Sequence, residues 1–329
     1  MVWTIRKHTI RIRRMKAYPL KFKPIYKQRI WGGQKLRKVF GKDIPIGEKI
    51  GESWEIADLP EDKSIITNGE LAGQTLGWAI EKYPKEIMRD EDFSGPFPLL
   101  IKFLDARDVL SVQVHPDAET CRRLGKGEPK TECWYIVSAT PGAVIYKGLK
   151  KGVTKEKFAE AIKKGTAAQM LAKVPVKAGE CYFLPAGTAH SIGAGLLIAE
   201  IQTPSDTTYR VFDWSRVDDS GKARELHITE ALESIHFDVA DDNPPVTTAG
   251  RLADCEYFKV DKANQAGGSE VLLWPGEIKI IIIISGCGTI SAGEGKIVEF
   301  KAGDTLLIPA VYEGAIRFAE DTQYLTVTT

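Results

Sequence analysis

A stretch of fourteen residues occurs twice in this chain, and it constrains the fold more than any other feature. KAGECYFLPAGTAH (177–190) and KAGDTLLIPAVYEG (301–314) share Lys-Ala-Gly, an acidic residue, a strand-like run and Pro-Ala in one register. Self-similarity of this kind indicates one structural module built twice. The copies differ at the last position, where the first has His190 and the second has Gly314. Any metal or acid–base chemistry of this module is therefore expected in the first copy.

Short β-rich runs separated by Gly and Pro turns surround the first copy. They cover residues 109–115, 132–138, 142–147, 180–184 and 196–202. Such a pattern is typical of a sandwich or barrel. Apolar residues with a period of 3.6 interrupt it and predict a helix over 71–88 and a helical insert over 151–174. We therefore expect a mainly β protein of two barrels with a few helical insertions.

Three segments are expected along the 329 residues. Residues 1–17 form a basic extension without the apolar stretch of a secretory signal. It is either a basic arm or a stretch upstream of translation from Met15, and we favour the second interpretation. Residues 18–245 are predicted to form the first, catalytic domain, and residues 246–329 a degenerate second domain without metal ligands.

The overall charge points to a small-molecule partner. The 45 basic and 44 acidic residues nearly cancel, which argues against a partner such as nucleic acid or an anionic membrane. The longest aliphatic run, residues 280–284, is far shorter than a membrane span. The five cysteines are odd in number and lack CxxC spacing, so we expect reduced thiols and a cytoplasmic protein. No oligomeric state is predicted.

The run VLSVQVHP (109–116) carries the first chemical signal. Side chains of a strand alternate between its two faces, so Ser111, Gln113 and His115 point one way. By the same alternation Lys130 and Glu132 share a strand face in GEPKTECWYIV.

The spacing of Gly179, Pro185, Gly187 and His190 matches the second motif of the cupin superfamily, whose jelly-roll barrels hold a metal. The first cupin motif, H-x-H followed by Glu, corresponds to Gln113-Val114-His115 and Glu132, with Gln in place of the first His. If these strands are neighbours, two imidazoles and two oxygen ligands converge. Such a set suits Zn²⁺ and also accepts Co²⁺, Mn²⁺ or Fe²⁺.

Together with QRIWGG (28–33), GESWEIAD (51–58), SVQVHPD, PKTECWYIV, PAGTAHSI and AEIQTPSDTTYRVFDW (199–214), these motifs resemble the type I mannose-6-phosphate isomerases in their short bacterial form. The resemblance covers most of residues 18–213 and the shorter C-terminal module. It implies interconversion of mannose 6-phosphate and fructose 6-phosphate through a cis-enediolate, with one Zn²⁺ per chain. The implied metal ligands are Gln113, His115, Glu132 and His190, and the implied further active-site residues are Ser111, Lys130, Glu200, Asp206 and Arg210.

Within that reaction Glu200 is our candidate base, because burial on the apolar strand LLIAEIQ (196–202) would raise its carboxyl pKa. The alternative is that Glu200 is an ion-pair partner of Arg210 or Lys130. Asp206 is a rival for either role. We favour Arg210 near the reacting atoms, with Ser111 and Lys130 as polar contacts to which no individual task is assigned.

Two other functions compete with an isomerase. A non-catalytic metal-binding bicupin acting in sugar binding or regulation would have no need of a base and two cations beside the metal. An Fe(II) dioxygenase usually presents three histidines, whereas Gln113 supplies a neutral oxygen here. His227 and His236 match no motif and are interpreted as ordinary residues.

Overall fold

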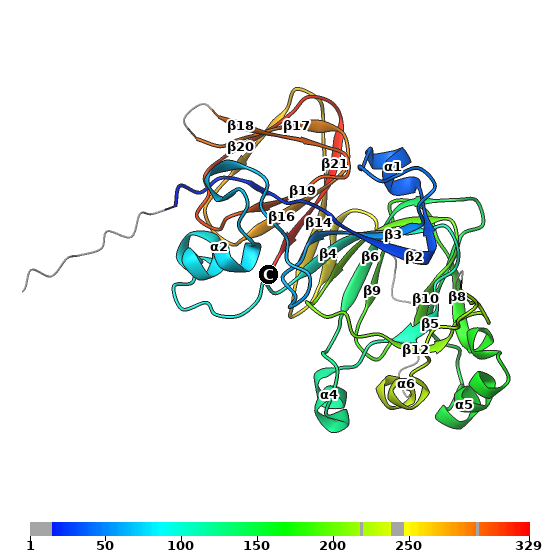
Figure 1. Cartoon of the computed structure of the whole chain (residues 1–329). Helices are drawn as coiled ribbons and strands as arrows, with labels where there is room; N and C mark the ends of the chain where they lie inside the picture. The colour runs from blue at the N-terminus through cyan, green and yellow to red at the C-terminus, as the bar shows by residue number, and fades with distance from the viewer. Residues whose placement is uncertain (1–14, 218–219, 238–246, 294–295) are drawn as a thin grey trace, which may run out of the picture.

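Four antiparallel sheets build the molecule as two barrels that lie side by side (Figure 1). The structure is a computed structural model that describes residues 15–217, 220–237, 247–293 and 296–329. Most of the predicted extension 1–17 and the predicted boundary at 245/246 lie outside the described residues. The mainly β architecture expected from the short strands is confirmed.

The first barrel combines a sheet of order β2-β3-β4-β11-β6-β9 with one of order β12-β5-β10-β7-β8. Its strands are β2 (Ile25–Gly33), β3 (Ile50–Ile56), β4 (Leu100–Ala106), β5 (Val112–Val114), β6 (Glu132–Ala139), β7 (Val144–Leu149), β8 (Leu171–Pro175), β9 (Cys181–Leu184), β10 (His190–Ile192), β11 (Leu196–Gln202) and β12 (Tyr209–Phe212).

The second barrel combines the orders β1-β19-β16-β21-β14-β13 and β15-β20-β17-β18. Its strands are β1 (Leu20–Lys21), β13 (Gly250–Asp254), β14 (Lys259–Gln265), β15 (Glu270–Leu273), β16 (Lys279–Ser285), β17 (Cys287–Ser291), β18 (Ile297–Lys301), β19 (Thr305–Ile308), β20 (Gly314–Phe318) and β21 (Thr322–Thr328). Strand β1 pairs with β19, so a segment assigned to the first domain from the sequence completes a sheet of the second barrel.

The internal repeat extends through the strand pairing of both barrels. Strand β6 pairs with β9 and β11, as β16 pairs with β19 and β21. Strand β10 pairs with β5 and β7, as β20 pairs with β15 and β17. Strands β4–β11 therefore correspond one by one to β14–β21, which lets each position of the first barrel be matched to one of the second.

Helices cover the outside of the barrels. They are α1 (Lys35–Phe40), η1 (Gly69–Leu71), α2 (Leu76–Lys82), α3 (Pro84–Met88), α4 (Ala118–Leu124), α5 (Lys155–Lys163), η2 (Ala167–Met170) and α6 (Ile228–Ser234). A single helix over 71–88 is wrong: α2 ends before Pro84, whose ring suits the first turn of a new helix and not a helix interior. The insert predicted over 151–174 is helical only to Met170, and its last residues belong to β8.

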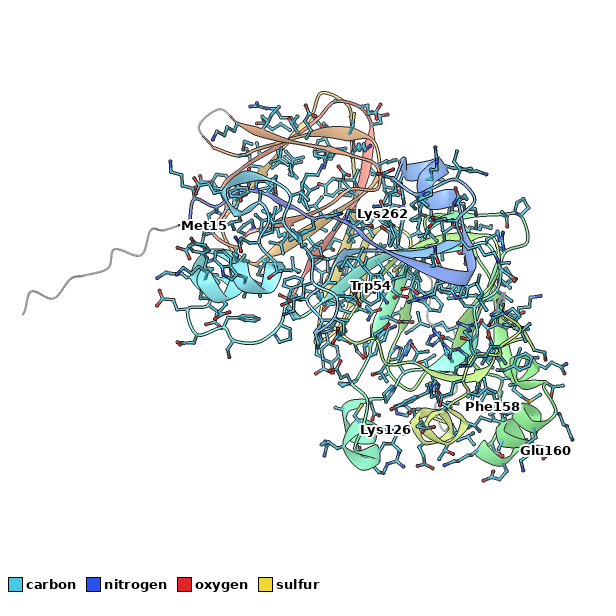
Figure 2. All side chains as sticks on the ribbon, in the orientation of Figure 1. Met15, Trp54, Lys126, Phe158, Glu160 and Lys262 are labelled. Carbon is cyan, nitrogen blue, oxygen red and sulfur yellow. The ribbon has the colours of Figure 1, made fainter. Side chains whose placement is uncertain are left out.

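Helix α5 illustrates how the helices attach. The Thr154 side chain accepts a hydrogen bond from the Lys157 amide and caps its first turn. Phe158 is fully buried against the sheet that contains β5, whereas Glu160 points to solvent (Figure 2).

Between the barrels lies a shared apolar core. Along β6, Trp134 and Ile136 face the interior of the first barrel, and Cys133 and Tyr135 face the second barrel. Strands β4 and β11 are buried at every residue, because both of their faces are covered. The interior of the first barrel is thus held by a rigid double-sided sheet, and the candidate site lies inside it.

Candidate metal centre and active-site cavity

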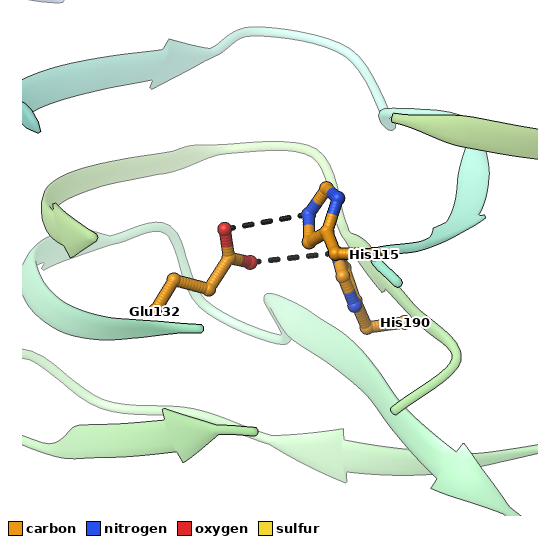
Figure 3. A group of neighbouring side chains, drawn as sticks. All are labelled: His115, Glu132 and His190. Atoms are coloured by element: carbon orange, nitrogen blue, oxygen red, sulfur yellow. Dashed lines mark ion pairs between the residues drawn. The ribbon is translucent and has the colours of Figure 1, made fainter. Parts of the chain in front are cut away.

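His115, Glu132 and His190 meet inside the first barrel (Figure 3). Strands β6 and β10 place Glu132 and His190 at their first residues, and His115 directly follows β5. Nε2 of His115 lies 3.4 Å from Oε2 of Glu132, and Nε2 of His190 lies 3.4 Å from Oε1. All three side chains are buried.

Both imidazoles present Nε2 to this cluster because Nδ1 is engaged elsewhere. Nδ1 of His115 donates to the carbonyl oxygen of Thr207 at 2.8 Å, and Nδ1 of His190 donates to that of Thr188 at 2.8 Å. A hydrogen bond of this kind fixes the neutral tautomer that ligates a metal through Nε2. Burial, reinforced by the Lys130 charge, lowers the pKa of His115 to about 3. Burial also lowers the pKa of His190.

The polar atoms of the cluster fit a divalent cation. Among the described residues, Nε2 of His115 and Oε1 of Glu132 are buried without a hydrogen bond. Burial opposes the charge of Glu132, but Lys130, with Nζ 3.0 Å from Oε2, and the two histidines hold the pKa of Glu132 well below its ordinary value. Ligands bound at about 2.1 Å in a tetrahedron are about 3.4 Å apart, which matches the two His–Glu separations.

Gln113 lies beside the cluster, directly opposite His190 in the pairing of β5 with β10. Its amide nitrogen is 3.4 Å from Nε2 of His190, and its oxygen accepts a 3.1 Å hydrogen bond from Ser111 Oγ. Only the amide oxygen can ligate a metal. Coordination by Gln113 therefore requires its amide group to be turned over.

The second barrel carries different residues at the matching positions. Leu273, Lys279 and Gly314 occupy the register positions of Gln113, Glu132 and His190. Tyr312 fills the space of the missing histidine side chain, because a Cβ on Gly314 would lie 2.0 Å from Tyr312 Oη.

A cavity of about 440 Å³ opens beside the metal cluster. Its charged lining residues are Arg29, Glu52, Lys102, Lys130, Glu200, Asp206, Arg210 and Arg224. Ser111 and Gln113 also line it, so the cavity is bordered by one implied metal ligand, Gln113, and by all five of the implied further active-site residues. Its size suits a small molecule, and its five cations against three acids suit an anion.

Glu200 lies deep in this cavity on β11. Its Oε2 accepts a 3.0 Å hydrogen bond from Trp134 Nε1, and its Oε1 lies 3.4 Å from Lys102 Nζ. Burial and the charge of Glu132 raise the pKa of Glu200, while Lys102 and Lys130 oppose the rise. The alternative interpretation of Glu200 was an ion pair with Arg210 or Lys130, but the ion pair in the structure is with Lys102.

Lys102 and Glu52 were missed by sequence reasoning. Nζ of Lys102 lies 3.9 Å from Glu52, which in turn pairs with Arg29 at 2.6 Å. Burial would raise the pKa of Glu52, but Lys102 and Arg29 lower it to about 2. The available signal was a lone lysine in the apolar run LIKFLDA (100–106), since a buried ammonium requires a buried acid nearby.

Arg210 on β12 and Ser111 directly before β5 also line the cavity, and they come from the other sheet of the first barrel. Nε of Arg210 donates to Ser111 Oγ at 3.1 Å, and Nη1 donates to the carbonyl oxygen of Glu225. His227 accepts a 3.3 Å hydrogen bond from the backbone nitrogen of Arg210. His236 is a surface residue paired with Asp117 at 2.8 Å, in keeping with an ordinary role.

Comparison with known proteins identifies the family. Residues 20–131 match the model for the catalytic domain of type I phosphomannose isomerase. The mannose-6-phosphate isomerase ManA of Bacillus subtilis is 38% identical over 307 residues, which cover 90% of this chain and 94% of that protein. The chain belongs to the mannose-6-phosphate isomerase family.

The structural comparisons agree with this assignment. The crystal structure of the mannose 6-phosphate isomerase from Bacillus subtilis superposes with a TM-score of 0.85 at 32% identity, over 94% of this chain and 99% of that one. A zinc-bound mannose 6-phosphate isomerase of 16% identity shares the fold, with a TM-score of 0.75 over 95% of this chain and all of that one. None of the described helices of this family member is both long and apolar enough to cross a bilayer.

Proposed function

We propose that this chain is a metal-dependent isomerase that interconverts mannose 6-phosphate and fructose 6-phosphate. Family membership supports this activity. The observation that carries it is the cavity that has the buried carboxylate of Glu200 and several cations in its lining, beside the cluster of His115, Glu132 and His190. A non-catalytic binding protein has no use for such a carboxylate.

We propose one Zn²⁺ per chain, held by His115, Glu132, His190 and Gln113. The donor set of imidazole nitrogen and carboxylate oxygen is one that Zn²⁺ prefers, and a relative of the same fold is zinc-bound. When bound, the cation would act as a Lewis acid that polarises the carbonyl and hydroxyl oxygens of the sugar.

Glu200 is the proposed base. It would take the proton from C2 of the aldose, so that the C–H electrons form a C1–C2 double bond while the π electrons of the C1 carbonyl move onto O1, which gives a cis-enediolate. It would return the proton to C1 while the O2 proton moves to O1, which completes the ketose. Its raised pKa suits a group that must both accept and give back a proton. Asp206, which is exposed at the cavity, is the second candidate.

The cations have two tasks in this proposal. Arg210 is the cation proposed to act near the reacting atoms, which its connection to Gln113 through Ser111 supports, and its charge would stabilise the developing oxyanion. Lys130 and Ser111 would contact the sugar phosphate. The remaining positive charge of the cavity balances the phosphate dianion.

The test is a coupled assay for fructose 6-phosphate formed from mannose 6-phosphate by zinc-loaded protein. Turnover that disappears after chelation and returns with zinc supports the proposal. Tight binding of the sugar phosphate without turnover would favour the binding protein instead. We also propose a cytoplasmic location, which the five free cysteines support.

A further inference from the structure

Gln202, the last residue of β11, is a buried side chain that the proposed reaction leaves without a role. It is fully buried and lies directly opposite Glu132 in the pairing of β11 with β6. Its amide nitrogen donates to the carbonyl oxygens of Thr203 at 2.9 Å and Ser205 at 2.6 Å. Both donors of the amide are thus used to hold the turn formed by residues 203–207.

The 203–207 turn is tied to the strand segment that carries Lys130 and Glu132. The backbone nitrogen of Thr203 donates to the carbonyl oxygen of Thr131 at 3.1 Å, and the backbone nitrogen of Thr131 donates to Thr203 Oγ1 at 3.2 Å. Ser205 Oγ donates to the carbonyl oxygen of Glu128 at 3.1 Å. The turn therefore fixes the chain immediately before Glu132.

The same turn also holds His115. Ser205 Oγ accepts a 3.2 Å hydrogen bond from the backbone nitrogen of Thr207. The carbonyl oxygen of Thr207 is the acceptor for Nδ1 of His115. Through this turn, one amide group supports two residues of the metal cluster that come from different strands.

The second barrel provides an internal comparison. Thr328 occupies the register position of Gln202, opposite Lys279. The barrel with Gln113, Glu132 and His190 has glutamine at this position, and the barrel with Leu273, Lys279 and Gly314 does not. The amide is therefore present in the barrel that has the metal ligands and absent from the barrel that lacks them, so the barrel fold itself does not require it.

We propose that Gln202 is a positioning residue of the metal centre, which sets the affinity for zinc by orienting His115 and Glu132 through the 203–207 turn. This inference rests on the metal site of the proposed function. Outer partners of metal ligands typically change metal affinity 10- to 100-fold, so an effect of that size is expected here.

Gln202→Glu tests the proposal in the full chain. The carboxylate has the shape of the amide but no N–H donor. It places an oxygen where the amide nitrogen was, next to the carbonyl oxygens of Thr203 and Ser205, which it repels. We expect zinc to bind about 10- to 100-fold more weakly, measured by competition with a chromophoric chelator. Gln202→Met, which is neutral and of similar length, should weaken zinc binding in the same direction and covers the case in which Gln202→Glu does not fold.

Two controls separate positioning from general stability. A purely structural role would lower the stability of metal-free and zinc-bound protein equally and leave the zinc affinity of the folded protein unchanged. Gln323→Glu makes the same change in the second barrel, where the amide donates to Asn264 at 2.9 Å, and should leave zinc affinity unchanged.

Wild-type zinc affinity in folded Gln202→Glu and Gln202→Met proteins would overturn the proposal. The readout does not depend on turnover. If the wild-type protein binds zinc but does not isomerise mannose 6-phosphate, the proposed function is wrong. The role of Gln202 is still tested in that case, by comparing the zinc affinities of the wild-type and variant proteins.

Discussion

Trp134 and Glu200 lie directly opposite each other on paired strands and are joined by a 3.0 Å hydrogen bond from the indole nitrogen to the carboxylate. The same indole packs edge-on against His190, with ring centroids 5.2 Å apart. One buried tryptophan therefore contacts both the proposed base and a proposed metal ligand. The proposed base and the proposed ligand Glu132 thus lie on one strand pair, β11 and β6, and Trp134 connects that pair to His190 on β10.

Glu200→Gln is expected to lower kcat by about 10²- to 10⁴-fold, the usual contribution of a general base. The amide keeps the shape of the side chain but cannot accept a proton. Zinc content should remain at the wild-type value, since Glu200 is not a proposed ligand. Asp206→Asn is the matched variant and should lower kcat much less. If Asp206→Asn lowers kcat strongly and Glu200→Gln lowers it only slightly, Asp206 is the base.

Lys102→Met is expected to shift the pH–rate profile and to destabilise the fold. The Lys102 ammonium lowers the pKa of Glu200, so its removal raises that pKa further. A base acts in its deprotonated form, and the acidic limb of the kcat profile should therefore move to higher pH. If the acidic limb of the kcat profile is unchanged or moves to lower pH, Lys102 does not lower the pKa of the base.

The same variant leaves two buried carboxylates without their shared cation. Breaking a buried ion pair typically costs about 3–5 kcal/mol, which denaturant unfolding of the Lys102→Met protein would measure.

Zinc binding at pH 6 should release fewer protons from the two histidines than two ordinary histidines would. Burial lowers the pKa of His115 to about 3, so His115 is neutral before the metal arrives, and burial also lowers the pKa of His190. Two ordinary histidines would release about 1.5 protons at this pH. Calorimetry of zinc binding in buffers of different ionisation enthalpy counts the protons. Release near the ordinary value would show that the histidines are charged in the metal-free protein.

The parts of the site that sequence analysis predicted depend on local periodicity. Ser111 and Gln113 share a face because side chains alternate along a strand, and the same rule placed Lys130 beside Glu132. Lys102 could not be matched to Glu200 in this way, because that contact depends on the pairing of β4 with β11, strands far apart in the chain. The break at Pro84 was visible in the sequence, but apolar periodicity on both sides of it predicted one helix.

Gly314→Ala tests whether Tyr312 occupies, in the second barrel, the space that the His190 side chain occupies in the first. The new Cβ would meet Tyr312 Oη at 2.0 Å and Ser291 Oγ at 2.4 Å, so we expect a loss of about 1–3 kcal/mol in the free energy of unfolding. Gly276→Ala, where a Cβ would meet nothing within 4 Å, is the matched control. Equal stability of the two variants would show that Tyr312 does not fill the position matching His190.

A crystal structure of the zinc-loaded protein, with anomalous data collected on both sides of the zinc edge, tests the central claim most directly. We predict one strong peak per chain, about 2.0–2.2 Å from Nε2 of His115, Nε2 of His190 and an oxygen of Glu132, and no peak at Gly314 in the second barrel. A peak elsewhere, or none between these three side chains, would contradict the proposed metal centre and the isomerase mechanism that depends on it.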